Sequence, residues 1–163
     1  MRYAITMALA GFAAAPAAAA TINVTVDIPA LKVAEYHRPY VAAWIEGANG
    51  AATNLQLWYD YDNRENGGTK WLAELRQWWR KAGRTTKVPA DGLTGATRAP
   101  GPQKITAAPK LTPGSYTLFV EAARENGGRE VVRVPFAWPP KGAQNAQAKG
   151  STELGTVAVT VAR

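Results

Sequence analysis

The chain contains no cysteine and only one histidine, His37. Without cysteine, disulfides, thiol chemistry and haem attachment through thioethers are excluded, so the fold must depend on packing. A single histidine makes a dedicated transition-metal site improbable. Beyond residue 20 there is also no run of the ~20 apolar residues that a membrane-spanning helix needs. We therefore expect no direct membrane span in the rest of the chain.

The N-terminus has the order of a secretory signal peptide. Arg2 precedes an apolar run at residues 3–15, which is followed by Pro16 and four alanines at residues 17–20. A transmembrane anchor is the alternative, but the apolar run is shorter than such a span. We expect cleavage near Ala20, export from the cytoplasm, and one domain at residues 21–163, a length that a single domain commonly occupies.

The formal net charge is +7, and removal of Arg2 with the signal peptide lowers it by one. A basic cytoplasmic domain would raise nucleic acid as a partner. Export and the absence of a basic-aromatic recognition module argue against that, so no nucleic-acid partner is expected. An acidic partner protein, an anionic cofactor or the membrane surface fits an exported basic domain better.

Alternating apolar residues predict several β-strands. The predicted strands are residues 21–28, 39–46, 54–61, 115–123, 129–138 and 156–161. Residues 39–46 are apolar on both faces, which indicates a central strand. Together with one helical insertion, this pattern predicts a mainly β protein, an Ig-like antiparallel β-sandwich with one amphipathic helix.

The predicted helix covers residues 69–82, where apolar residues recur at about 100° per residue and Gly83 follows as a stop. Its tryptophans, Trp71, Trp78 and Trp79, are expected to pack the helix onto the sheet. Residues 85–113 have no sustained periodicity and many prolines and glycines, which indicates a long functional loop. The polar, alanine-rich residues 141–149 are predicted to be mobile.

Inside the long loop, residues 91–97 read Asp-Gly-Leu-Thr-Gly-Ala-Thr. This resembles the acceptor motif of bacterial proteins that receive FMN from the periplasmic flavin transferase ApbE: Asp, two free positions, Ser or Thr, Gly, Ala and Thr. The matching residues are Asp91, Thr94, Gly95, Ala96 and Thr97. The resemblance implies covalent FMN, attached to Thr97 as a phosphoester by a flavin transferase. The residues alone also permit an ordinary Asp-Gly turn on a surface loop.

Such an acceptor must be exposed and deformable, because the transferase has to seat its backbone. The small residues of the motif permit close approach, and Asp91 and Thr94 can make local hydrogen bonds to the backbone. Arg98 is placed to pair with the phosphate. Further residues are candidates to contact the flavin ring, by stacking in the case of Trp78 and Trp79 and as cations near its N1 edge in the case of His37, Arg38, Arg76 and Arg80.

The chain is also similar to a family of predicted periplasmic proteins of unknown function. The similar stretches include residues 33–41, 69–72, 75–80 and 150–155. This resemblance implies a periplasmic location and company with flavin transferases and with PepSY-type membrane or other periplasmic redox proteins. The best-known flavin acceptors, however, carry the motif in an FMN-binding domain of a different fold.

These observations favour a periplasmic electron carrier rather than an enzyme, since no Gly-x-Ser-x-Gly elbow or P-loop is present. One alternative is a cofactor-free periplasmic binding or assembly module for an acidic or redox partner protein. Another is a cofactor-free accessory factor for metal or haem uptake.

Overall fold

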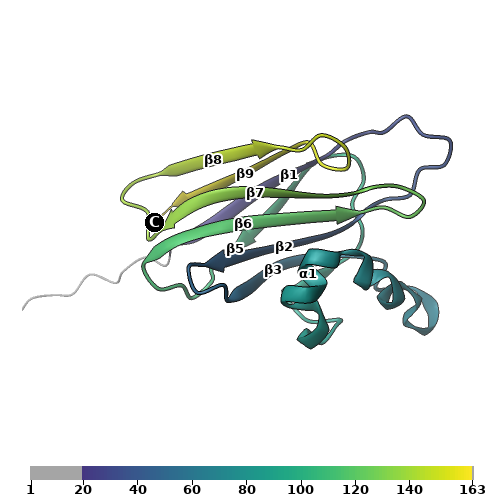
Figure 1. The fold of residues 1–163 in the computed structure, drawn as a ribbon, viewed down its shortest axis with the longest axis horizontal. Coiled ribbons are helices and arrows are strands. Elements are labelled where there is room, and N and C mark those ends of the chain that lie inside the picture. The colour runs from purple at the N-terminus through teal and green to yellow at the C-terminus, as the bar shows by residue number, and fades with distance from the viewer. Residues whose placement is uncertain (1–19, 163) are drawn as a thin grey trace, which may run out of the picture.

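The computed structural model describes residues 20–162, which form two β-sheets packed face to face (Figure 1). The expected signal peptide, residues 1–20, lies outside the described residues apart from Ala20. The strands are β1 (Thr21–Ile28), β2 (Tyr40–Gly47), β3 (Ala52–Trp58), β4 (Thr94–Gly95), β5 (Gly101–Ala107), β6 (Gly114–Ala123), β7 (Arg129–Trp138), β8 (Gln144–Lys149) and β9 (Thr156–Ala162). One sheet has the order β5-β1-β9-β8 and the other has the order β4-β3-β2-β6-β7. Neighbouring strands are antiparallel except β3 and β4, so the predicted antiparallel β-sandwich is confirmed.

The main core lies between the two sheets and is built from alternate residues of each strand. In β1, Ile22, Val24, Val26 and Ile28 are each at most 1% exposed. The Cα partners of Ile22, Val24 and Val26 in β9 are also apolar, as in the pair of Ile22 with Val161. Burying a side chain of this size contributes about 1.5–3 kcal/mol. A shift of one residue would turn the whole set to solvent, and the alternation therefore fixes the register.

Strand β2 is buried on both faces, as predicted. Val41 and Ile45 belong to the core between the sheets, whereas Ala42 and Trp44 belong to a second apolar cluster on the outer face of the same sheet. β3 and β6 flank β2. The helical segment after β3 covers this outer face (Figure 1), which gives the molecule a third, partial layer.

The helical segment is less regular than the predicted single helix. It consists of the 3-10 helix η1 (Arg64–Glu74), the α-helix α1 (Arg76–Lys81) and the 3-10 helix η2 (Gly83–Thr85). Leu72, Leu75 and Trp78 are buried as predicted, but the side chain of Trp71 is 56% exposed. A 3-10 helix has about 3 residues per turn instead of 3.6. Apolar residues at α-helical spacing therefore do not all lie on the same face of η1.

A buried carboxylate explains where α1 begins. Glu121 of β6 is fully buried, and its two oxygens accept hydrogen bonds from the backbone N–H groups of Gln77 (3.1 Å) and Trp78 (2.7 Å). Arg129 of β7 donates to the same carboxylate at 3.0 Å. The first N–H groups of a helix have no partner within it. Here a distant strand supplies the acceptor, which the periodicity of the helix cannot reveal.

Besides the two-residue β4, two strands lie in segments that the sequence predicted to be irregular. β5, within the long loop, pairs with β1. β8 pairs with β9, so the prediction of a mobile segment at residues 141–149 is wrong for β8. Both are edge strands. The half-buried positions of β8 are Gln144, Ala146 and Ala148, and such small or polar residues give an alternation too weak to detect.

Candidate functional site

The segment that resembles a flavin acceptor, residues 91–97, is called the acceptor segment here. Its centre is β4, which pairs in parallel with the end of β3. The Leu57 N–H donates to the Leu93 carbonyl oxygen at 2.8 Å, and the Tyr59 N–H donates to the Gly95 carbonyl oxygen at 3.0 Å. The acceptor segment is therefore anchored to a sheet edge, although the sequence predicted a freely deformable loop.

The motif residues differ in their surroundings. Thr94 Oγ1 accepts a hydrogen bond from the Ala90 N–H at 2.9 Å, a local bond of the kind expected. Gly95 lies against a tryptophan, because a Cβ added there would be 3.1 Å from Trp58 Cδ1. Two further motif residues are exposed, Asp91 and Ala96. The motif thus has half-buried anchoring positions and exposed ones.

Arg98 follows the motif and is exposed. Its guanidinium lies over the Trp58 ring at 5.3 Å from the centroid. A cation–π contact of this kind contributes about 0.5–1 kcal/mol at an exposed site. Gly95 and Arg98 therefore both contact Trp58, one on each side of Thr97.

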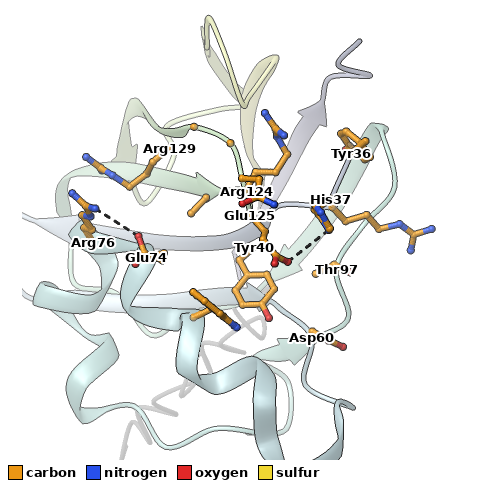
Figure 2. Close-up of a pocket in the computed structure, with 16 residues that line it drawn as sticks. Tyr36, His37, Tyr40, Asp60, Glu74, Arg76, Thr97, Arg124, Glu125 and Arg129 are labelled. Carbon is orange, nitrogen blue, oxygen red and sulfur yellow. Dashed lines mark ion pairs between the residues drawn. The ribbon is translucent and has the colours of Figure 1, made fainter. Parts of the chain in front are cut away.

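Thr97 lies where the chain leaves the sheet edge, and it lines a cavity of about 810 Å³. It is half-buried and belongs to neither apolar cluster. The other walls come from the chain around the start of β2, Asp60 after β3, the helical segment, and the hairpin between β6 and β7 (Figure 2). The volume is within the range of roughly 300–1,000 Å³ that is typical of small-molecule sites.

Most cations of the cavity wall are paired. The ion pairs are Arg76 with Glu74 at 3.7 Å, Arg129 with Glu121 at 3.0 Å and Arg124 with Glu153 at 2.9 Å. Arg38 is exposed and makes no ion pair with a described residue. An exposed pair such as Arg76 with Glu74 contributes only about 0–1 kcal/mol. Arg38 and Arg76 are accordingly the two cations most available to an anion.

His37 lines the cavity and faces the Glu125 carboxylate there (Figure 2), and a second carboxylate, that of Glu35, also lies close to its ring. Its Nε2 is 3.0 Å from Glu35 Oε1, and its Nδ1 is 3.6 Å from Glu125 Oε2. The Nε2 contact has the distance of an ion pair but not the geometry of a hydrogen bond, and Nε2 has no hydrogen-bond partner among the described residues. The Glu35 side chain is 69% exposed, so this contact contributes only about 0–1 kcal/mol, and the hydrogen-bonding capacity of Nε2 remains unused among the described residues.

Two tyrosines also line the cavity. The Tyr36 hydroxyl is buried and has no hydrogen-bond partner in the described part of the chain. Burial raises the pKa of Tyr36 above its usual value, and burial likewise raises the pKa of Tyr40. Both phenols are therefore protonated at neutral pH, and Tyr36 presents an unused donor.

The hairpin wall is held by a buried ion pair. Arg124 donates to Glu153 through Nε at 2.9 Å and through Nη2 at 3.1 Å, and both side chains are almost fully buried. The Gly128 N–H donates to the same carboxylate at 2.8 Å. A bidentate, charge-assisted contact of this type fixes orientation as well as distance, so the hairpin is tied to the loop before β9.

That loop, residues 150–155, is itself organised by Glu130 of β7. The Glu130 carboxylate accepts the backbone N–H groups of four successive residues, Ser151, Thr152, Glu153 and Leu154, and the Ser151 hydroxyl. Desolvation raises the pKa of Glu130, but the hydrogen bonds outweigh it and lower the pKa to about 2. This explains structurally one of the stretches by which the sequence resembles its family.

The two tryptophans expected to stack on a flavin do not line the cavity. Trp78 is buried, and its Nε1 donates to Asn54 Oδ1 at 2.8 Å. Trp79 packs against the outer cluster. Trp71, which periodicity assigned to packing, lines the cavity instead. Sequence reasoning did not select Tyr36 as a site residue, and its only signal was an aromatic and histidine-containing stretch directly before a strand.

The fold and the cavity define a β-sandwich domain with a helical cover on one sheet and a polar, aromatic cavity at one end. A family model described as a predicted periplasmic protein, DUF2271, matches residues 21–156. The chain belongs to this family, which confirms the resemblance seen in the sequence. Comparison with curated proteins and with solved structures gave no match.

Two further observations apply to residues 20–162. No helix there is both long and apolar enough to cross a membrane. Nor does that range contain a group of three or more side chains placed to hold a metal ion. The family description as predicted periplasmic agrees with the export signal read from the sequence.

Proposed function

We propose that this protein is a periplasmic electron carrier with FMN esterified to Thr97. One observation carries the proposal: the threonine that ends the acceptor motif lies on the wall of a cavity of about 810 Å³, half-buried and outside both apolar clusters. A second protein can therefore approach this side chain without opening the sandwich. The attached group would start beside a cavity of suitable size.

The modification is a phosphoryl transfer catalysed by the flavin transferase. The Thr97 hydroxyl oxygen forms a bond to the phosphorus in the FMN half of FAD. The bond from that phosphorus to the bridging oxygen breaks, and AMP leaves with the oxygen. The hydroxyl proton passes to a base of the transferase. The anchoring of the acceptor segment by β3 holds the flanking backbone, so only the residues after Gly95 have to adapt to the transferase.

The residues around Thr97 fit a flavin. Arg38 and Arg76 are available to the phosphate or to a reduced, anionic ring, while Trp71 supplies an aromatic face. A bound flavin supplies reversible electron transfer, with electrons arriving from a reduced redox protein and leaving to an oxidised one. The family resemblance favours PepSY-type membrane proteins or other periplasmic redox proteins as these partners.

The test is the intact mass and visible absorbance of the mature protein after co-production with a flavin transferase. We expect the added mass of one FMN phosphoester and a yellow protein, and we expect Thr97→Val to lose both. Thr53→Val is the matched control, because Thr53 is an exposed threonine outside the motif. An unmodified wild-type protein would refute the proposal and favour a cofactor-free binding module, whose basic surface recognises an acidic partner.

A further inference from the structure

The cavity contains polar atoms that its own residues leave without partners. Of four buried side-chain atoms that lack a hydrogen bond among the described residues, the Tyr36 hydroxyl and His37 Nε2 belong to the cavity wall. Buried polar groups in proteins are nearly always satisfied. Two such groups from adjacent residues are therefore left for a partner from outside the described chain, either a water molecule or the polar edge of a ligand.

We propose that this cavity binds the isoalloxazine ring of the flavin on Thr97, with Tyr36 and His37 hydrogen-bonded to its polar edge and Trp71 against its face. This inference rests on the proposed function, since it concerns the same modified protein. It adds that the ring is held in a defined protein site instead of remaining in solvent at the end of its tether.

Tyr36 is suited to this role because its hydroxyl has no competing hydrogen-bond partner among residues 20–162. Its phenol is protonated at neutral pH and so donates a hydrogen bond to a carbonyl oxygen or ring nitrogen. Tyr40 differs, because its phenol has a backbone hydrogen bond with Asp60. His37 can donate or accept at Nε2 according to its tautomer, which matches the mixed donors and acceptors along the polar edge of a flavin.

Trp71 supplies the apolar contact. It is the most exposed of the large hydrophobic residues that the structure describes, and it lies on η1 at the cavity wall. Its neighbours in the helical segment, Leu72 and Leu75, are fully buried, so η1 is firmly placed while its tryptophan remains uncovered. An indole face gains from stacking on a planar ring.

The position of Thr97 determines how far the attached flavin ring has to extend to enter the cavity. Because Thr97 lines the same cavity as Tyr36, His37 and Trp71, a group attached there begins at the wall. Figure 2 shows Thr97 on the side of the cavity where His37, Tyr40 and Asp60 lie. The flexible chain between the phosphate and the ring then has only to cross the cavity, and tethering raises the effective concentration of the ring at the site.

Tyr36→Phe tests the hydrogen bond, and Tyr59→Phe is its matched control. Both tyrosines have a buried hydroxyl with no hydrogen-bond partner in the described part of the chain, but of the two only Tyr36 lines the cavity. The FMN-modified proteins are compared by flavin fluorescence and by accessibility to a soluble quencher. We expect Tyr36→Phe to shift the equilibrium between docked and free ring by roughly two- to tenfold, the effect of one hydrogen bond, and Tyr59→Phe to leave it unchanged.

Trp71→Ala tests the stacking contact, and Tyr61→Ala is its control, since Tyr61 is also exposed but lies outside the cavity wall. Wild-type flavin emission should be several-fold lower than that of the same flavopeptide after proteolysis, and Trp71→Ala should recover most of the difference. Modified protein whose emission equals that of the flavopeptide, or variants indistinguishable from their controls, would overturn this inference and leave the carrier function intact. Absence of the FMN mass would instead overturn both.

Discussion

Glu130→Gln is expected to destabilise the protein at neutral pH and to have a smaller effect in acid. The pKa of Glu130 falls from its ordinary value of 4.5 to about 2 in the folded state. A pKa difference of one unit is equivalent to about 1.4 kcal/mol, so the ionised carboxylate stabilises the folded state by at most about 3 kcal/mol. Because Glu130 is half-buried, solvent screening reduces the expected contribution to about 1–2 kcal/mol.

The sign follows from the direction of the shift. A carboxylate whose folded pKa is lowered stabilises the protein above its unfolded pKa, and this contribution is lost as the pH falls from 4.5 towards 2. The assay is urea denaturation of the wild type and Glu130→Gln across that range. Glu65→Gln is the control, since Glu65 is exposed and makes no hydrogen bond or ion pair with the described residues. The free energy of unfolding should differ less between wild type and Glu130→Gln as the pH falls. A difference that stays constant across this range would refute the reasoning.

Three further changes test the hairpin wall of the cavity and the acceptor segment. Arg124→Met leaves the buried carboxylate of Glu153 without its cation and should cost about 3–5 kcal/mol in chemical denaturation; a loss below 1 kcal/mol would show that the pair is not buried in solution. Gly92→Ala should cost about 1 kcal/mol through its positive φ of 72° alone, because nothing lies within 4 Å of the added Cβ. Gly95→Ala, by contrast, should act by contact, displacing Trp58 and shifting its fluorescence; equal spectra for the two alanine variants would contradict this distinction.

The strands of the central sandwich could be predicted because each has a buried face of large apolar residues. β1 and β7 begin and end where their alternation predicts, at Thr21–Ile28 and Arg129–Trp138. β8 could not be predicted, since an edge strand lined by alanine and glutamine carries little hydrophobic contrast. The helix was predicted too long because its start depends on Glu121, which is remote in sequence and bonds the backbone of α1.

The candidate site could be predicted only in part for a related reason. The acceptor motif is contiguous, so Thr97 was identifiable from the sequence. The cavity beside it is assembled from separate segments, and no local pattern links Tyr36 or Trp71 to Thr97. Trp78 and Trp79, which lie nearer to the motif along the chain, pack into the outer cluster instead. Proximity in sequence was therefore a poor guide to which aromatic residues meet the acceptor.

Three carboxylates explain how a chain without cysteine keeps the walls of this cavity in place. Glu121 fixes the start of α1, Glu153 fixes the hairpin after β6, and Glu130 fixes the loop that contains Glu153. Each binds backbone N–H groups of a segment far from it in sequence, and such charge-assisted bonds are stronger than neutral ones. Walls held in this way are set before any ligand arrives. A ring that enters the cavity therefore meets an already ordered site, and little of its binding free energy is spent on ordering the protein.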